Sequence, residues 1–190
     1  MKKIGITGGI GSGKSIVTQL LDVLGYPIYD SDYYAKWLMH NSEDLRKSLQ
    51  NEFGDDIYID GLLNRPKLAS IVFADPTRLK TLNSIVHPSV RAHFAQWAQE
   101  QTAKLVFIES AIMFDAGLDR LLDEVWVVTA PKEERVARAM ARDKSTSEQI
   151  EARMGNQMTE EAMIERSQRV IRNGAGDVLL SQIQAILEEF

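Results

Sequence analysis

Residues 8–15 combine glycine, lysine and serine at a spacing that binds phosphate. They read Gly-Gly-Ile-Gly-Ser-Gly-Lys-Ser, with Gly at the first position of the motif and Gly-Lys-Ser at its end. Glycine permits positive φ and lets the backbone approach a phosphate without a Cβ in the way. Successive N–H groups at the start of a helix would then form an anion nest, to which the helix dipole adds positive potential. The sequence therefore predicts a loop for the phosphates of a nucleotide, with Lys14 at the β- and γ-phosphates and Ser15 on Mg²⁺.

The segments on both sides of this loop are the elements that must position it. Residues 3–7 predict a short strand, and the apolar residues after the loop recur at helical spacing until Gly25. An accidental glycine-rich turn is the alternative, and it would require neither the strand nor the helix. The residues expected to contact the nucleotide are Gly8, Gly9, Ile10, Gly11, Ser12, Gly13, Lys14, Ser15 and Ile16.

Carboxylates follow two further predicted strands, residues 26–29 and 105–108. The first strand ends at Asp30 and Asp32, and the second ends at Glu109. In open α/β sheets, ligands bind at the carboxyl ends of the strands, where a carboxylate can hold Mg²⁺ through water or accept the proton of an attacking hydroxyl. Each of these residues could instead be a helix cap. We predict Asp32 as the catalytic carboxylate, while Glu109 could serve magnesium, the substrate or a cap.

Arginines gather on one predicted helix in the second half of the chain. Arg135, Arg138 and Arg142 share a helical face, and phosphoryl transfer needs cations to offset the charge on the moving group. The alternative is a solvated face whose arginines pair with nearby acids. We favour a catalytic role for Arg138 and Arg142, and only weakly for Arg135. The polar residues 144–147 are typical of the tip of a mobile lid, which we expect over about residues 142–157.

The stretch of about residues 41–101 is predicted to be mostly helical and is longer than an ordinary crossover between strands. We therefore expect an inserted substrate-binding subdomain, in which Arg65, His87 and Arg91 stand out. If a helix begins after Pro88, Arg91 lies in its first turn. A cation there is unfavourable with respect to the helix dipole unless a bound anion pairs with it. An ordinary surface arginine and a hydrogen-bonded histidine explain these residues equally well.

Strands alternate with helices along the rest of the chain, which favours an α/β fold with a parallel sheet. Further buried strands are predicted at residues 125–128 and 169–172, giving a five-stranded sheet in a three-layer α/β/α domain. The core of this single domain would comprise about residues 1–40 and 102–190, with the helical insertion and the lid attached to it. Asn173, after the last strand, could meet an adenine edge or simply form a turn.

Composition narrows the class of protein. The 190 residues carry a net charge of −5, which argues against a broad nucleic-acid interface and favours a small polyphosphate ligand held by local clusters. We expect no nucleic-acid or membrane partner and a cytoplasmic protein, because no apolar run is long enough to span a bilayer and no signal peptide is apparent. There is no cysteine, so disulfides and thiolate chemistry are excluded. The oligomeric state is open, with a monomer favoured.

Several motifs taken together resemble the dephospho-CoA kinase family of P-loop kinases, which are of the nucleoside-monophosphate-kinase type. The resemblance spans nearly the whole chain. It rests on the loop of residues 5–15, the Asp30 and Asp32 pair, residues 61–65, Val72-Phe73, Leu82-Asn83, His87-Pro88-Ser89-Val90-Arg91, Arg142-Asp143, the spacing of Arg153 and Gln157, and residues 170–173. The His-Pro-x-Val-Arg segment makes the combination much more specific than the loop alone.

This resemblance implies that ATP, with Mg²⁺, phosphorylates the 3′-hydroxyl of 3′-dephospho-CoA to give ADP and CoA. It implies that Asp32 faces that hydroxyl, that Arg65, His87, Arg91 and Glu109 bind the acceptor, and that Arg142 and Asn173 bind ATP. Two alternatives stay open: a kinase of this fold for a nucleoside monophosphate or shikimate, and a nucleotide-dependent switch. A GTPase switch would carry an Asn-Lys-x-Asp motif, which this sequence lacks.

Overall fold

A computed structural model describes the backbone of residues 1–190 and every side chain except that of Phe73. Phe73 belongs to the motifs that carry the family resemblance, and its side chain lies outside the described residues. The chain divides into two compact units. The first comprises residues 1–29 and 101–190, and the second comprises residues 30–100.

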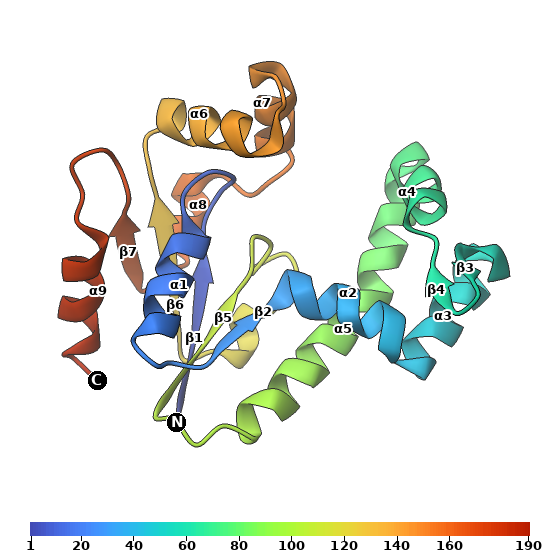
Figure 1. Ribbon diagram of the computed structural model, residues 1–190, viewed down its shortest axis with the longest axis horizontal. Helices are drawn as coiled ribbons and strands as arrows, with labels where there is room; N and C mark the ends of the chain where they lie inside the picture. The colour runs from blue at the N-terminus through green and yellow to red at the C-terminus, as the bar shows by residue number, and fades with distance from the viewer. The chain divides into compact units, whose positions relative to one another are not determined.

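A five-stranded sheet with the order β2-β5-β1-β6-β7 forms the centre of the first unit (Figure 1). Its strands are β1 (Lys2–Thr7), β2 (Ile28–Asp30), β5 (Leu105–Glu109), β6 (Glu124–Thr129) and β7 (Arg169–Arg172). Strand β1 runs parallel to β5 and β6, with Ile6 opposite both Glu109 and Trp126, and β6 runs parallel to β7. The predicted five-stranded parallel sheet is confirmed, and its register brings the ends of β1 and β5 together.

Helices α1 (Lys14–Val23) and α9 (Leu179–Leu187) pack side by side against this sheet. The strands are apolar on both faces, as expected for a parallel sheet that is covered on both sides. Ile6, Phe107 and Trp126 are fully buried, and Val17 of α1 and Ile183 of α9 join the same core cluster. Helix α1 is therefore fixed along the sheet, and the loop that precedes it starts from a rigid strand and ends on a rigid helix.

Helices α6 (Lys132–Asp143) and α7 (Ser147–Gly155) lie beyond the carboxyl ends of β1 and β6 (Figure 1). Lys144 ends α6 in the left-handed conformation with φ 52°, and Thr146 begins α7 with a capping box to Gln149. Such a box satisfies two helix-end donors at once and gives the second helix a defined start. Helix α8 (Glu160–Glu165) follows and contacts β6.

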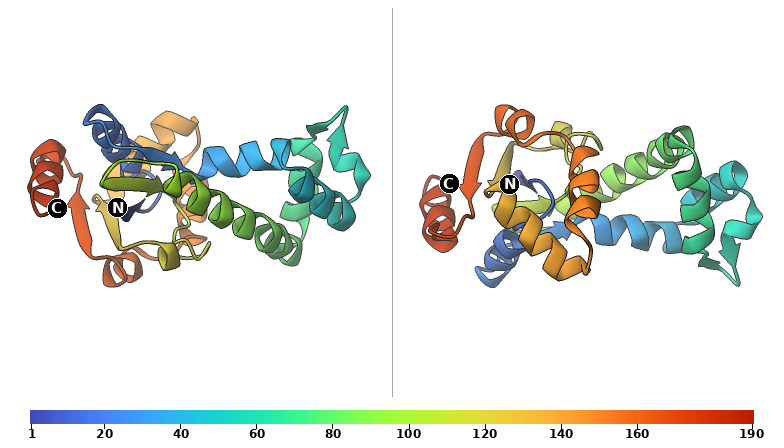
Figure 2. Two further views of the ribbon diagram at one scale, coloured as in Figure 1. Left: turned by 90° about the horizontal axis from the view of Figure 1, so that it is seen from below. Right: turned by 90° about the horizontal axis from the view of Figure 1, so that it is seen from above.

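The second unit contains helices α2 (Ser31–Asn41), α3 (Glu43–Phe53), α4 (Arg65–Ala74) and α5 (Pro76–Gln99). Helices α2 and α5 pack side by side, as the two views of Figure 2 agree. A hairpin of β3 (Tyr58–Ile59) and β4 (Leu62–Leu63) interrupts the helices of this stretch, which we predicted to be mostly helical. Its turn holds Asp60 at φ 50° and Gly61 at φ 80°, the Asp-Gly pair that suits a two-residue hairpin.

Helix α5 continues through Pro88, so no helix begins there, and Arg91 lies in the interior of α5 and not in a first turn. A proline inside a helix costs about 3 kcal/mol, because it lacks an N–H and crowds the preceding turn. The residues Val86, Val90, Phe94 and Ala98 form a buried stripe along α5, and burying such side chains outweighs that cost. Among the described residues, no helix has the length and hydropathy of a membrane span.

Candidate active site

The loop between β1 and α1 has the backbone that its glycines predict. Gly8, Gly11 and Gly13 have φ of 148°, 76° and 97°, values that other residues rarely adopt. A Cβ on Gly8 would collide with the carbonyl oxygen of Val128, and one on Gly13 with the side chain of Asn173. Gly13 caps α1 without any side-chain hydrogen bond. Since the first N–H groups of a helix lack intrahelical partners, this end of α1 can bind an anion.

Lys14 folds back over this loop. Its Nζ donates to the carbonyl oxygens of Gly8 at 2.9 Å and Gly9 at 3.3 Å. The ammonium group is thus held against the backbone of the phosphate loop. In loops of this motif, the lysine at this position reaches the β- and γ-phosphates of the nucleotide.

Ser15 and Glu109 lie in direct contact at the ends of α1 and β5. Ser15 Oγ donates to Glu109 Oε1 at 2.9 Å, and Thr18 Oγ1 donates to Glu109 Oε2 at 2.7 Å. A hydroxyl beside a carboxylate is an oxygen donor set of the kind that Mg²⁺ prefers. Among the described residues, no group of three or more His, Cys, Asp or Glu side chains could hold a metal. The residues therefore fit an ion held by Ser15, phosphate oxygens and water, and not one in an all-protein cage.

Arg138 and Asn173 connect α6 to the phosphate loop. Arg138 Nη2 donates to the Asn173 carbonyl oxygen at 2.8 Å and to Glu134 Oε2 at 2.7 Å. Asn173 Nδ2 in turn donates to the Ser12 carbonyl oxygen at 2.8 Å. Arg138 Nη1 is buried and has no hydrogen-bond partner among the described residues. Buried donors are nearly always paired in native proteins, so this one fits an anionic ligand.

A hollow of about 270 Å³ opens where the phosphate loop faces α6. It brings together residues that we predicted for the donor: Gly11, Gly13, Lys14, Ser15, Ile16, Arg138 and Arg142 all line it, together with Ala139. The remaining loop residues Gly8, Gly9, Ile10 and Ser12 and the predicted Asn173 do not line this hollow, and Asn173 contacts Ser12 instead.

The Arg142 guanidinium is hydrogen-bonded to the carboxylate of the next residue, Asp143. Its Nε and Nη2 donate to Asp143 at 2.7 and 3.1 Å, and Arg153 Nη1 donates to the same carboxylate at 2.7 Å. Hydrogen bonds from Arg142 first and Arg153 second hold the pKa of Asp143 well below its usual range. Asp143 therefore stays ionised and joins the end of α6 to α7.

Arg135, the arginine we favoured least, contacts the phosphate loop directly. Its Nε donates to the Ile10 carbonyl oxygen at 3.1 Å, and its Nη1 pairs with Glu160 at 2.8 Å. Gln157 Oε1 accepts a hydrogen bond from Ile10 N at 2.9 Å. This contact of Gln157 was not predicted, because nothing in the spacing of a single glutamine indicates a partner 147 positions away in the sequence.

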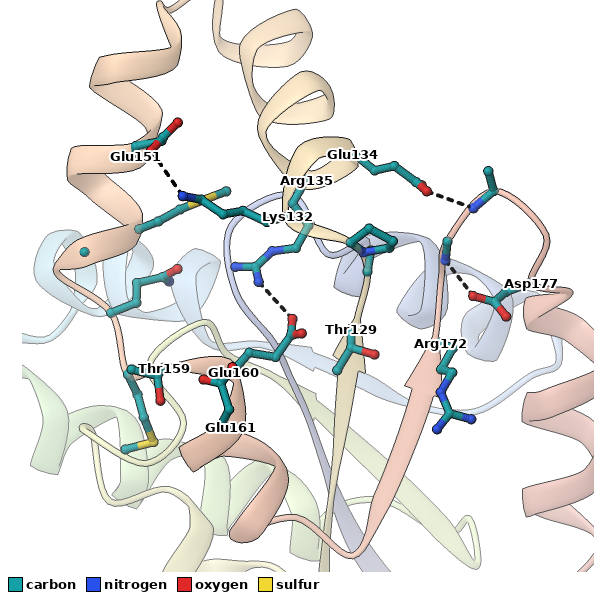
Figure 3. A pocket seen from close by; sticks show the side chains of 18 residues that line it. Thr129, Lys132, Glu134, Arg135, Glu151, Thr159, Glu160, Glu161, Arg172 and Asp177 are labelled. Atoms are coloured by element: carbon teal, nitrogen blue, oxygen red, sulfur yellow. Dashed lines mark hydrogen bonds and ion pairs between the residues drawn. The ribbon is translucent and has the colours of Figure 1, made fainter.

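A larger hollow of about 680 Å³ lies among α6, α7, α8 and the ends of β6 and β7 (Figure 3). Ion pairs join Lys132 to Glu151 and Arg135 to Glu160 along its walls. No residue of the phosphate loop lines it, so its size does not make it the phosphate site.

The residues predicted for the acceptor all belong to the second unit, apart from Glu109. Asp30 caps α2 by accepting from Asp32 N and Tyr33 N, each at 2.9 Å, and Asp32 is an exposed residue of the first turn. Arg65 begins α4. His87 and Arg91 lie one turn apart on α5 and so share a face.

The chain matches known proteins along nearly its whole length. Residues 2–178 match the model of the family described as dephospho-CoA kinase. The dephospho-CoA kinase of Porphyromonas gingivalis is 42% identical over 189 residues, covering 99% of this chain and 94% of that protein. The dephospho-CoA kinase of Thermus thermophilus is 41% identical, covering 98% and 90% of the two chains.

Solved structures agree with these sequence matches. A crystal structure from Thermus thermophilus superposes with a TM-score of 0.85 and 39% identity, covering 100% of this chain and 97% of that one. Dephospho-CoA kinase from Campylobacter jejuni has a TM-score of 0.72 and 26% identity, covering 98% and 96%. A shikimate kinase from Bacteroides thetaiotaomicron, at 12% identity and a TM-score of 0.58, shares the fold. The chain therefore belongs to the dephospho-CoA kinase family, as the sequence motifs predicted, and is an ATP-dependent phosphotransferase of the final step of CoA biosynthesis.

Proposed function

We propose that the γ-phosphoryl group of ATP is bound in the hollow between the phosphate loop and α6, and is transferred from there to the 3′-hydroxyl of dephospho-CoA. The observation that carries this proposal is the convergence of Lys14, Ser15, Arg138 and Arg142 on that one hollow. Transfer through a loose transition state requires little covalent chemistry from the protein, so positioning and charge stabilisation supply most of the catalysis.

The donor side is carried by backbone N–H groups and cations. The N–H groups at the start of α1 bind phosphate oxygens, and Lys14 leaves its two carbonyl partners to reach the β- and γ-phosphates. Arg138 donates to the phosphates through Nη1, which has no hydrogen-bond partner among the described residues. Arg142 gives up one of its hydrogen bonds to Asp143 and donates to the nucleotide instead. Asn173, held against Ser12, borders the adenine of ATP.

Ser15 and Glu109 are the residues that would hold Mg²⁺. When bound, the ion neutralises charge between the β- and γ-phosphates. The hydrogen bond between Ser15 and Glu109 supports the magnesium alternative for Glu109 over a direct role on the acceptor, because it places the carboxylate beside the hydroxyl ligand. Glu109 would then orient Ser15 or a water on the ion.

Asp32 serves the acceptor side, where it orients the 3′-hydroxyl and accepts its proton as the new bond to phosphorus forms. Arg65, His87 and Arg91 bind the pyrophosphate and the nucleoside of dephospho-CoA; guanidinium groups suit phosphate because they donate two parallel hydrogen bonds. We also propose that the protein works as a cytoplasmic monomer without a nucleic-acid or membrane partner.

An ADP-release assay with ATP and Mg²⁺ tests the reaction. The acceptors to compare are 3′-dephospho-CoA, AMP, CMP, shikimate and none, with product mass determined in each case. We expect ADP release to depend on 3′-dephospho-CoA and its product to gain one phosphoryl group. Preference for AMP, CMP or shikimate would assign another acceptor to this fold, and equal release without any acceptor would leave only nucleotide hydrolysis.

A further inference from the structure

The backbone of Ile10 is held on both sides of its Cα by side chains that flank the α6–α7 segment: one binds the Gly9–Ile10 peptide group and the other binds the Ile10–Gly11 peptide group. Gln157 Oε1 accepts from the Ile10 N–H at 2.9 Å, and Arg135 Nε donates to the Ile10 carbonyl oxygen at 3.1 Å. Arg135 is itself fixed, because its Nη1 pairs with Glu160 at the start of α8 at 2.8 Å. Figure 3 shows the Arg135 side chain running from α6 toward Glu160 along the wall of the larger hollow.

The backbone of α6 packs directly on the same part of the loop. The Arg135 side chain is only 12% exposed. A Cβ on Gly9 would collide with the guanidinium of Arg135, and a Cβ on Gly11 would collide with the Arg135 carbonyl oxygen. Glycine at these two positions is therefore required by the approach of α6, in addition to any approach of phosphate. Glycine on both sides of Ile10 makes this part of the loop conformationally permissive. The contacts from Arg135 and Gln157 are what hold it in one conformation.

The two contacts stand at the two ends of the α6–α7 segment. Arg135 lies in the first turn of α6, and Gln157 lies two residues after α7 ends at Gly155. Both ends of the segment are thus hydrogen-bonded to the backbone of one residue of the phosphate loop, Ile10. A lid movement of α6 and α7 must pivot at these contacts or break them.

We infer that Arg135 and Gln157 are positioning residues, which fix the orientation of the two peptide groups that flank Ile10 in the phosphate loop and confine lid movement to residues 136–156. This inference rests on the proposed role of the loop in phosphoryl transfer. Ordering a backbone residue costs conformational entropy. If the glycine-flanked Ile10 is already ordered before ATP binds, that cost does not reduce the rate of phosphoryl transfer. Arg135 and Gln157 act through the loop and not on the substrate.

Gln157→Met tests the inference, since methionine has a similar length and only a weak acceptor. Gln168→Met is the matched control, because Gln168 Oε1 also accepts a backbone N–H, from Val125 at 2.7 Å, at the start of β6. We expect Gln157→Met to lower kcat about 10- to 100-fold, the loss that follows small misplacement of reacting groups, with a smaller change in the dissociation constant of a non-hydrolysable ATP analogue. Gln168→Met keeps wild-type kcat.

Amide hydrogen exchange at Ile10, followed by NMR in the free protein, gives a second readout that needs no substrate. The exchange rate of the Ile10 amide should rise at least about 10-fold in Gln157→Met, as the bond that protects it is lost, and stay unchanged in Gln168→Met. An unchanged rate, or a kcat equal to that of Gln168→Met, would overturn the inference. The exchange comparison remains valid if the wild-type protein fails to phosphorylate dephospho-CoA. Failure of the positioning role of Arg135 and Gln157 and failure of the proposed reaction are therefore distinguishable.

Arg135→Lys tests the second contact, which is the hydrogen bond to the Ile10 carbonyl oxygen. Lysine keeps the charge that pairs with Glu160 but lacks the Nε–H that reaches Ile10 while Nη1 reaches Glu160. We expect a kcat loss similar to that of Gln157→Met, and a double variant that is little worse than either single one, because both side chains hold the backbone of the same residue. Strictly additive losses, or wild-type kcat in Arg135→Lys, would show that the two side chains do not act as one unit.

Discussion

The two aspartates at the start of α2 have different surroundings although they stand two positions apart. Asp30 uses its carboxylate as the cap of the helix, accepting from Asp32 N and Tyr33 N. Asp32 lies in the first turn with an exposed side chain. Asp30 thus serves as the cap of α2, and Asp32 is the carboxylate that we propose for the acceptor hydroxyl.

Asp32→Asn should therefore lower kcat by about 10²- to 10⁴-fold, the usual contribution of a general base, while ATP affinity stays nearly the same. Steady-state rates with dephospho-CoA and calorimetry with a non-hydrolysable ATP analogue measure the two quantities. Asp30→Asn is the matched control, because asparagine caps a helix as well as aspartate does. A larger loss in Asp30→Asn than in Asp32→Asn would reverse the assignment.

Glu109 offers a second comparison at the scale of single residues, since both of its oxygens accept from hydroxyls of α1. Only Ser15 stands at the motif position that ligates Mg²⁺. We expect Ser15→Ala to raise the Mg²⁺ concentration for half-maximal activity by about 10-fold or more, as the loss of groups that hold a metal commonly does. Thr18→Val, which also removes a hydrogen bond to Glu109, should change it far less. Equal shifts in a Mg²⁺ titration would mean that Ser15 acts only through Glu109.

At the scale of elements, Asp143 joins α6 to α7 through hydrogen bonds from Arg142 and Arg153. The pKa of this carboxyl is lowered in the folded protein. The contact between α6 and α7 therefore contributes its full stability above the ordinary aspartate pKa near 4, and this stability is lost progressively as the pH falls from there toward the lowered pKa. Both arginine side chains are half exposed or more, so salt weakens the contact.

We expect amide exchange in α7, corrected for its intrinsic pH dependence, to begin losing protection as the pH falls below about 5 and to go on losing it below pH 3, because the pKa of the paired carboxyl lies well below the ordinary aspartate range. Asp143→Asn should be less protected already at neutral pH and should lack this step. The difference between the two proteins isolates Asp143 from the other carboxylates. If both lose protection in parallel, the stability of α7 does not depend on Asp143.

Local patterns predicted the phosphate loop and the strands correctly, because glycine spacing and continuous apolar runs act over a few residues. The β3–β4 hairpin was missed although Asp60 and Gly61 carry a turn signal, since two-residue strands have no periodicity to detect. Pro88 was misjudged because long-range packing along α5 decides whether a helix tolerates proline. The contact of Gln157 with Ile10 could not be predicted, because it depends on how α6 and α7 fold over the loop.

At the scale of the whole molecule, the donor and acceptor residues belong to different units. Lys14, Ser15, Glu109 and the arginines of α6 belong to the first unit, and the carboxylate and cations proposed for dephospho-CoA belong to residues 30–100. Each unit has its own buried core: Ile6 and Trp126 are fully buried in the first, and Leu49 and Phe94 are fully buried in the second. Each substrate should therefore leave its own footprint on the chain.

Hydrogen exchange with one substrate at a time measures these footprints. A non-hydrolysable ATP analogue should protect the phosphate loop and the N-terminus of α1, and dephospho-CoA should protect the first turn of α2 and the middle of α5. Binding at 100 times the dissociation constant stabilises a protein by about 2.7 kcal/mol, enough to slow exchange that depends on opening by about 100-fold. Lys14→Ala should lose the first footprint and keep the second, and Arg91→Ala should do the reverse, because each variant removes a cation from one proposed site only. If the ATP analogue alone protects the middle of α5 in the wild-type protein and Arg91→Ala removes that protection, α5 contributes to the nucleotide site and the assignment of Arg91 to the acceptor is wrong.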